Sequence, residues 1–435
     1  MNDVATIFAP ATGHQAAAIA VIRVSGPRVR SGLVAVTGQM PAPRFMALRT
    51  LREPDGGEID RGLVVFFPGP ASFDGYDAAE LHVHGGPAVV ARVVAVLAAL
   101  PGFRLAEPGE FTRRALENGK LDLAEVEGLG DLVAAEIEAQ RRQALDRMSG
   151  RVSSRVEDWR DRLIRVRAML EAAMDFSDED DVPGDVDMGL DAEIQALRAE
   201  IGEELASRVG ERVRTGCEIV VLGPPNAGKS SLVNALARRD VAIVSETPGT
   251  TRDLIEVRLD LGGVPVTVVD TAGLREASGD TIEREGMLRA RRRAAAADVR
   301  LALVDLADPL APEPADLVVG NKADLVGGSV PDGIDIAVSV ATGAGMERLL
   351  EELSERANAL TTAGEGVVVT RQRHREILGA CVAALDEALA PRETNAPELR
   401  AEALRRAGDA LGRITGRVGV EDLLDVIFRD FCIGK

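Results

Sequence analysis

The chain has 435 residues, 46% of them hydrophobic, and a formal net charge of -19. A chain of this length and composition is globular and has room for about three domains. The acidic balance excludes a broad electrostatic grip on nucleic acid, so any contact with RNA needs a local basic patch or a partner protein. Three widely spaced cysteines exclude a disulfide framework and indicate a reducing compartment. We expect a cytoplasmic protein without a membrane span, because the N-terminus lacks a leader pattern and no apolar run is long enough to cross a bilayer.

Residues 1–118 mix β-like runs with turn signals, which predicts an α+β domain. The predicted elements are strands at 19–24, 62–67 and 80–86 and a helix at 87–100. On a strand, His82 and His84 share one face, so a metal pair is conceivable. With four histidines in the chain and no third ligand nearby, we assign them a structural role and predict no metal there.

From residue 119 the pattern changes to helix, with apolar residues at three- and four-residue spacing. The predicted helices cover 121–148, 152–174, 190–213, 371–389, 397–414 and 420–428. The acidic stretch at 175–187 is interpreted as a solvated loop, with a cation site as the alternative. Because these helices flank a nucleotide-binding pattern, we expect a helical domain in two parts, 119–214 and 361–435, interrupted by an inserted domain at 215–360.

The stretch from Gly223 to Ser231 lies between a predicted buried strand at 218–222 and a helix start. Strand, glycine-rich turn and helix form the context of a phosphate-binding loop. Lys229 supplies a mobile cation for the phosphates, and Ser230 supplies a hydroxyl for Mg²⁺. The residues expected to hold the phosphates are Asn226, Ala227, Gly228, Lys229, Ser230 and Ser231. The chain is therefore predicted to bind a nucleoside triphosphate.

Two further segments complete the phosphate side of the site. Thr251, in a turn rich in hydroxyls, is expected to complete Mg²⁺ coordination. A strand at 266–269 ends in Asp270-Thr271-Ala272-Gly273, where the carboxylate can hold Mg²⁺ through water and Gly273 can offer an N–H to the γ-phosphate. Position 274 is a leucine, which cannot polarise water as the glutamine of Ras-like enzymes does. Another group must orient the water, and the candidates are Glu276, Glu283 and Glu285.

The third motif selects the base. Asn321-Lys322-Ala323-Asp324 follows a strand at 317–320, and an aspartate there accepts two hydrogen bonds from guanine that adenine cannot offer. The further base-contacting loop is Ser339-Val340-Ala341. Because the three motifs occur in order and each ends a strand, the nucleotide is predicted to be GTP. The link between 305 and 321 is proline-rich and too short for a full crossover helix, so one peripheral helix is predicted to be truncated.

Only four of the 51 basic residues are lysines, namely Lys120, Lys229, Lys322 and Lys435. A chain that otherwise uses arginine should keep lysine where a planar guanidinium cannot replace a compact ammonium. Two of the four already lie in nucleotide motifs. Lys120 and Lys435 therefore become site candidates, with chance survival as the alternative.

Several blocks of the chain resemble the tRNA-modification GTPase family MnmE, also called TrmE or ThdF. They lie at 20–26, 80–86, 108–115, 118–123, in the nucleotide motifs and at 431–435. The Asn-Gly-Lys-Leu-Asp-Leu block and the terminal Phe-Cys-Ile-Gly-Lys are specific to this family. The resemblance implies a multidomain α+β and α/β protein: an N-terminal folate-binding and dimerisation domain at 1–118, a discontinuous helical domain and an inserted Ras-like P-loop GTPase domain.

The resemblance also implies an activity. Family members hydrolyse GTP to GDP with Mg²⁺ and K⁺, form homodimers, and work with an FAD-containing MnmG protein in a heterotetramer or larger complex. Together they add a carboxymethylaminomethyl-type group to C5 of the wobble uridine of tRNA, which is expected to be bound mainly through the partner. The one-carbon unit is implied to come from 5-formyl- or methylene-tetrahydrofolate.

Functional residues carry over position by position. Folate contacts fall on Arg23, Glu80, Lys120 and Lys435, and K⁺ ligands on Asn226, Ser245, Thr247 and Thr250. Glu283 is implied to orient the water, and Cys432 stands where the family has its terminal cysteine, a candidate catalytic residue. The chain departs from the family at 13–15 and at Phe73-Asp74-Gly75-Tyr76-Asp77, where the family has Tyr-Thr-Gly-Glu-Asp.

Two other functions stay open at this point. One is a switch GTPase of ribosome assembly without modification chemistry, which would ignore folate. The other is a folate-dependent one-carbon enzyme whose nucleotide domain is only a sensor. The pair Lys120 and Lys435 counts against the first, and the complete set of nucleotide motifs counts against the second.

Overall fold

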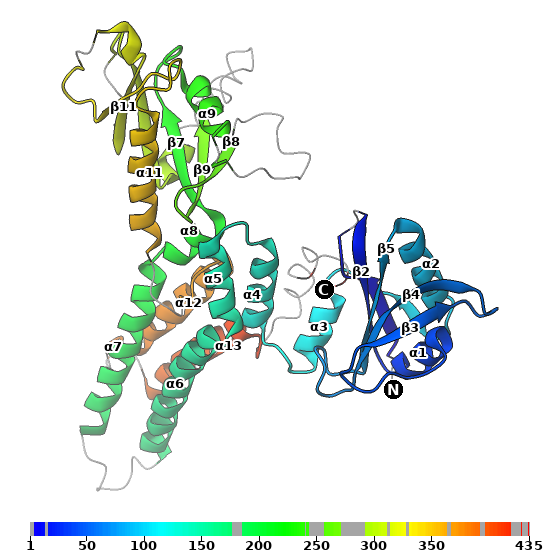
Figure 1. The fold of residues 1–435 in the computed structure, drawn as a ribbon. Coiled ribbons are helices and arrows are strands. Elements are labelled where there is room, and N and C mark those ends of the chain that lie inside the picture. Colours follow the sequence, from blue (N-terminus) through cyan, green and yellow to red (C-terminus); the bar gives the residue numbers. More distant parts are fainter. Residues whose placement is uncertain are drawn as a thin grey trace, which may run out of the picture. The chain divides into compact units, whose positions relative to one another are not determined.

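The structure is a computed structural model, and its two compact units are residues 1–130 with 411–435, and residues 131–410 (Figure 1). Each unit is described by itself. The described residues are 4–13, 16–175, 185–239, 241–242, 256–270, 292–310, 314–327, 330–362, 367–391, 396–418, 428 and 434.

The first unit is built on a six-stranded sheet with the strand order β3-β4-β5-β2-β1-β6. Neighbouring strands are antiparallel, except for the parallel pair β1 and β6. The strands are β1 (Thr6–Pro10), β2 (Ala17–Ser25), β3 (Ala47–Arg52), β4 (Glu58–Phe67), β5 (Ala78–Gly85) and β6 (Phe103–Leu105). The predicted strands in this region are confirmed as β2, β4 and β5, whereas β1, β3 and β6 were not predicted.

Helices α1 (Val29–Thr37) and α2 (Pro87–Ala98) pack on one face of this sheet. Successive side chains of a strand point to opposite faces, so alternate residues of β2 such as Ile22 and Val24 are buried in the helix-covered core. The predicted helix at 87–100 is confirmed as α2. A third helix, α3 (Glu110–Glu117), was not predicted.

The C-terminal part of the chain returns to this first unit. Phe428 is buried, and the guanidinium of Arg113 on α3 lies 5.2 Å from the centre of its ring. Gly434 packs on the end of β1, since a methyl group added to it would lie 2.4 Å from the carbonyl oxygen of Pro10. Phe428 therefore lies against α3, and Gly434 lies against the first strand of the sheet.

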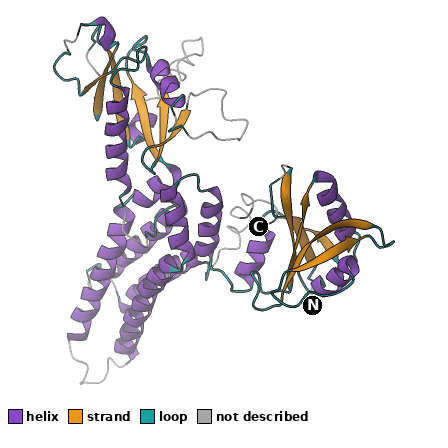
Figure 2. Ribbon diagram, viewed as in Figure 1, coloured by secondary structure: helices purple, strands orange, loops and turns teal. Residues whose placement is uncertain are grey.

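Helices alone make up one part of the second unit (Figure 2). They are α5 (Glu138–Met148), α6 (Arg151–Asp175), α7 (Asp185–Ala206), α8 (Val209–Thr215) and α12 (Gln372–Ala388), with α4 (Leu123–Ala134) before them and α13 (Pro397–Thr415) after them. Helix α7 packs on both α6 and α12. Helices that precede the inserted sheet in the sequence thus pack against a helix that follows it.

Three expectations about these helices need correction. The predicted helix at 121–148 is two helices, because Ile137 is extended (φ -136°, ψ 164°) and separates α4 from α5. Of the predicted loop at 175–187, residue 175 belongs to α6 and residues 185–187 to α7, whereas 176–184, with the alternative cation site, lie outside the described residues. The predicted helix at 190–213 is also divided, with α8 beginning at Val209. Apart from Phe428, the predicted helix at 420–428 lies outside the described residues.

The second sheet has the strand order β12-β11-β10-β7-β9-β8 and is parallel except for β8. Its strands are β7 (Cys217–Leu222), β8 (Glu256–Asp260), β9 (Pro265–Asp270), β10 (Val299–Asp305), β11 (Leu317–Asn321) and β12 (Ile336–Ala337). Apolar clusters bury both faces of β7, as expected for a central parallel strand. The predicted strands are confirmed, and the described residues between β10 and β11 contain no helix, as predicted.

Helical segments accompany this sheet in the described part of the chain, including residues 292–296 before β10. Helix α9 (Lys229–Ala237) follows β7, and α11 (Met346–Thr361) follows β12. The strand order changes direction at β7, since β9 lies on one side of it and β10 on the other. In open parallel sheets, ligands bind beyond the carboxyl ends of the strands at such a point.

Candidate functional site

The turn from β7 to α9 has the backbone of a phosphate-binding loop. Gly223 (φ 142°), Asn226 (φ 64°) and Gly228 (φ 95°) all take positive φ values. A methyl group at Gly228 would also lie 2.4 Å from Asn321 Nδ2, so only glycine fits there. Local sequence therefore dictates a tight turn that ends at the N-terminus of α9, where backbone N–H groups attract anions.

The lysine of this turn is folded back over it. Lys229 is buried, and its Nζ donates hydrogen bonds to the carbonyl oxygens of Gly223 (3.0 Å) and Pro224 (2.9 Å). The ammonium thus lies above the loop that would hold the phosphates.

A hydroxyl and a carboxylate meet beside the loop. Ser230, in the first turn of α9, donates a hydrogen bond to Asp270, which ends β9 and is fully buried. The register explains the meeting, because Asp270 pairs with Val221 near the end of the neighbouring strand β7. A serine hydroxyl and a carboxylate oxygen are hard donors of the kind that Mg²⁺ prefers, so these two residues fit that ion.

The base-reading motif is tied to the phosphate loop. The amide of Asn321 donates to the carbonyl oxygen of Ala227 (2.9 Å) and accepts from the backbone N–H of Val340 (3.2 Å). Ser339 is buried in the same loop, whereas Asp324 is exposed and free to meet a base. The structure thus brings together residues of the phosphate loop, Asp270 at the end of β9 and the base-reading motif at Asn321.

One pair at this edge was not predicted. Lys322 Nζ lies 2.5 Å from Oδ2 of Asp305, the last residue of β10. The hydrogen bond from Lys322 lowers the pKa of Asp305, although partial burial opposes the shift. The local sequence carried no signal for this pair, because the pairing depends on β10 lying beside β11 in the sheet.

Several predicted site residues lie outside the described residues, and the structure neither joins nor separates them from the site. They are Ser245, Thr247, Thr250, Thr251, Thr271, Ala272, Gly273, Glu283, Cys432 and Lys435. Of the remaining nucleotide candidates, Asn226 and Ser231 are exposed and Ala341 is exposed in the loop after Val340.

A cavity of about 240 Å³ opens in the first unit. Arg23 and Glu80 both line it, with 3.4 Å between Arg23 Nη2 and Glu80 Oε1, because β2 and β5 place them opposite each other. The guanidinium of Arg23 also lies 5.5 Å from the centre of the Phe73 ring and 5.7 Å from that of Phe111. The cavity thus combines flat apolar walls with charges of both signs.

Of the other two folate candidates, only Lys120 relates to this cavity, through Gly75, which follows the lining residue Asp74. Gly75 packs against the stem of Lys120, since a methyl group there would lie 3.4 Å from its Cε. Gly434, next to Lys435, packs on Pro10 at the end of β1. Lys435 itself is not described.

Asp74 is a cavity-lining residue that was not predicted as a site residue. It is buried, and its carboxylate accepts hydrogen bonds from the Ser25 hydroxyl (2.5 Å) and the Tyr76 backbone N–H (3.2 Å). Burial raises the pKa of Asp74, and the hydrogen bond from Ser25 only partly offsets that. The departure from the family pattern at 73–77 was the signal that could have identified it.

The two histidines on β5 each pair with a carboxylate. His82 Nε2 lies 3.2 Å from Glu80 Oε2, and His84 Nδ1 lies 2.7 Å from Asp60 Oδ1. Within the described ranges, no three histidine, cysteine or acidic side chains gather closely enough to hold a metal ion. None of the described helices has the length and apolar character needed to cross a bilayer.

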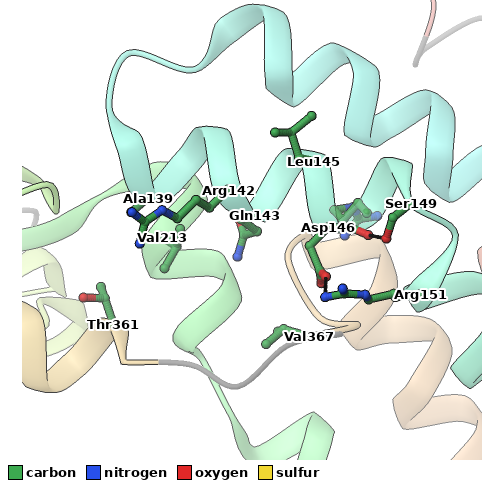
Figure 3. A pocket seen from close by; sticks show the side chains of 11 residues that line it. Ala139, Arg142, Gln143, Leu145, Asp146, Ser149, Arg151, Val213, Thr361 and Val367 are labelled. Carbon is green, nitrogen blue, oxygen red and sulfur yellow. Dashed lines mark hydrogen bonds and ion pairs between the residues drawn. The ribbon is translucent and has the colours of Figure 1, made fainter.

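A larger cavity, of about 660 Å³, lies among the helices of the second unit (Figure 3). Its lining includes Arg142 and Arg151, but both are already paired, with Glu138 and Asp146 respectively, each at 2.7 Å. None of the predicted site residues lines this cavity. We assign no function to it.

Comparison with known proteins matches two parts of the chain to family models. Residues 6–120 match the family model described as the N-terminus of GTP-binding protein TrmE, and residues 123–432 match the model of the MnmE helical domain. A protein named tRNA modification GTPase MnmE from Parvibaculum lavamentivorans is 54% identical over 99% of this chain and 100% of its own length. The protein of that name from Methylobacterium radiotolerans is 51% identical over the full length of both chains.

Among solved structures, the G domain of the T. maritima FeoB iron transporter is 26% identical and covers 32% of this chain and 98% of its own, with a TM-score of 0.24.

Proposed function

The chain belongs to the MnmE family of tRNA modification GTPases, and from that membership we propose that it is a K⁺-stimulated GTPase that acts with an FAD-containing MnmG-type partner. The pair would add a carboxymethylaminomethyl-type group to C5 of the tRNA wobble uridine, with the one-carbon unit taken from a tetrahydrofolate. GTP hydrolysis would drive conformational steps of that cycle. A cytoplasmic setting follows from the tRNA substrate.

The assembled nucleotide edge is the observation that carries this proposal. Ser230 and Asp270 fit Mg²⁺, Lys229 lies over the loop, and Asn321 links the base motif to that loop. When bound, Mg²⁺ and K⁺ supply positive charge beside phosphate oxygens that gain negative charge during transfer. This chain's own residues bind and orient the nucleotide, and Asp324 is proposed to accept the hydrogen bonds of guanine.

The proposed K⁺ ligands are Asn226, Ser245, Thr247 and Thr250, and Thr251 is proposed to join Ser230 at Mg²⁺. Support comes from Asn226 itself, which is exposed at the tip of the loop with a left-handed backbone (φ 64°). Such a conformation in a non-glycine residue costs free energy and is concentrated at functional sites. Glu283 is proposed to orient the attacking water, and Thr271, Ala272 and Gly273 to form the switch turn.

The cavity lined by Arg23 and Glu80 is proposed to bind the tetrahydrofolate. A pterin is a flat ring with an edge of N–H donors, and folate ends in carboxylates. Phe73 and Phe111 supply flat apolar surfaces, the carboxylates accept hydrogen bonds, and arginine suits an anionic group. Lys120 and Lys435 are proposed to complete the site, with Cys432 nearby as a candidate catalytic residue.

We also propose that the chain forms a homodimer through its N-terminal domain. The sheet face opposite α1 and α2 has exposed apolar residues, and Leu48 of the edge strand β3 stands opposite Leu63 of β4. Phe45 and Met46, just before β3, are also exposed. Exposed apolar residues that lie side by side, as Leu48 and Leu63 do, favour an interaction surface.

The proposed domain division is 1–118, 119–214, 215–360 and 361–435, with the third segment inserted into the helical domain. The contact between α7 and α12 supports that insertion. The net charge of -19 supports binding of tRNA mainly through the partner.

The decisive test is GTP hydrolysis in KCl and in NaCl at equal ionic strength. We expect strong stimulation by K⁺ in the wild type and its loss in Asn226→Ala. Asn234→Ala is the matched control, because Asn234 is an exposed asparagine of α9 outside the loop. Equal rates of the wild type in both salts would remove the K⁺ assignment and direct attention to an activator supplied by a partner.

Two binding measurements test the N-terminal assignments. Calorimetry with 5-formyltetrahydrofolate should show binding that Glu80→Gln weakens at least tenfold, since a half-buried carboxylate that accepts donor hydrogen bonds is lost. The control is Glu58→Gln, which changes an exposed acid of β4. Light scattering should show a dimer that becomes a monomer in Leu48→Asp, and a wild-type monomer would refute the dimer.

A further inference from the structure

Asp305 lies at the nucleotide edge of the sheet and has no role in the function proposed above. It ends β10 and stands in register with Asn321 of β11. One of its carboxylate oxygens lies 2.5 Å from Lys322 Nζ, and the other accepts a hydrogen bond from the Ala307 backbone N–H at 2.9 Å. Both oxygens are thus engaged, by the chain's base-reading motif and by the turn that follows β10.

Lys322 has a backbone conformation that needs support. Its φ of 64° and ψ of 36° lie in the left-handed region, which is unfavourable for a residue other than glycine. Such conformations persist where several contacts determine them together. Here the carbonyl oxygen of Lys322 accepts from the Leu325 N–H at 3.0 Å, and its ammonium is held by Asp305.

The geometry also explains why this residue is a lysine in a chain with only four of them. Since the Ala307 N–H occupies one oxygen of Asp305, a single oxygen faces position 322. A point-like ammonium satisfies one oxygen, whereas a guanidinium pairs best with both. The two residues are matched to each other.

We propose that Asp305 is a positioning residue of the guanine site, which holds Lys322 in the conformation that receives a guanine nucleotide. The proposal rests on the assignment of Lys322 and Asp324 to that site. Asp305 itself does not touch the nucleotide and acts only through Lys322. It therefore affects how tightly the base is held and not the chemistry at the phosphates.

The first test compares Asp305→Asn with the wild type in the full-length protein. Asparagine keeps an acceptor for the Ala307 N–H and removes the charge that faces Lys322. We expect the KM for GTP and the Kd for a fluorescent GDP analogue to rise about threefold to tenfold, because the pair is only partly buried, with kcat changed less than twofold. Asp308→Asn is the matched control, an exposed aspartate in the same turn, and should leave all three constants unchanged.

A double-mutant cycle separates positioning from general structure. Lys322→Ala should weaken GDP binding, and Asp305→Asn should add no further loss in that background, since its effect passes through the lysine. Additive losses would overturn the proposal, as would unchanged GDP binding in Asp305→Asn when Lys322→Ala weakens it. If Lys322→Ala itself leaves GDP binding unchanged, the guanine-site assignment fails and the role of Asp305 fails with it.

Discussion

Substitution of Asn321 by alanine should separate the two halves of the nucleotide site. Asn321 is 3% exposed, and its amide makes one buried hydrogen bond to the Ala227 carbonyl oxygen and one partly buried bond from the Val340 N–H. Alanine removes both and leaves two backbone groups without these partners. At roughly 1.5–2 kcal/mol for the buried group and 0.5–1 kcal/mol for the other, the loss is about 2–3 kcal/mol.

Because the two bonds join the phosphate loop to the base-reading loop, we expect most of this loss to appear in nucleotide affinity. A loss of about 2–3 kcal/mol corresponds to a Kd for GDP roughly 30- to 150-fold higher. Titration with a fluorescent GDP analogue measures the Kd. Thermal unfolding without nucleotide measures the part of the free-energy loss that lowers the stability of the fold instead. Asn358→Ala, which changes an exposed asparagine on α11, should alter neither. A Kd within threefold of the wild type, with an unchanged unfolding midpoint, would refute this linkage.

Three further predictions concern titratable side chains. Burial opposes ionisation of Glu110, but its arginine partners hold its pKa below 4.5, so the ion pairs stabilise the fold above that pH and are lost as the pH falls through the folded-state pKa. Glu110→Gln should lower stability by about 2 kcal/mol at pH 7, and thermal unfolding at pH 7 and pH 3 should show the difference shrink in acid. Burial raises the pKa of Asp74, so the protonated carboxyl contributes stability at low pH. This contribution is lost as the pH rises through the folded-state pKa. Asp74→Asn should keep or raise the urea midpoint at pH 8, and a large drop would contradict this. Burial raises the pKa of both Cys217 and Cys381 to about 12, so at pH 8 a disulfide reagent should modify at most one of the three thiols until urea is added.

The nucleotide edge was predictable from sequence because each motif is local. Gly228, Ser230 and Asp270 follow directly from strand, turn and helix signals, and parallel strands bring their carboxyl ends to one edge. The pairing of Asp305 with Lys322 was not predictable in the same way. It depends on which strand lies beside β11, and the tertiary structure determines that neighbour.

The N-terminal unit was less predictable for the same physical reason. Strand β1 is short and gains its place by pairing with β6, almost a hundred residues away, at Thr6 and Phe103. Nothing within either segment encodes that pairing. In the helical region the apolar spacing continues through residues 135–137, so periodicity alone could not predict the break at Ile137.

The inserted topology also constrains the order in which the chain can fold during synthesis. The carboxylate of Glu204 at the end of α7 accepts hydrogen bonds from the backbone N–H groups of Val368 and Val369, residues made 164 and 165 positions later. At about 5–20 residues per second, a ribosome needs roughly 10–30 s to produce that interval. During this time the inserted sheet can fold first, and its completion brings α8 and α11 into contact. A loop of this length would otherwise oppose closure by roughly 4–5 kcal/mol of chain entropy. The first unit waits longest, because Phe428 and Gly434 contact α3 and β1 and are made more than 300 residues after them. A chain cut before Phe428 would contain the described nucleotide edge but lack these two contacts of the N-terminal unit.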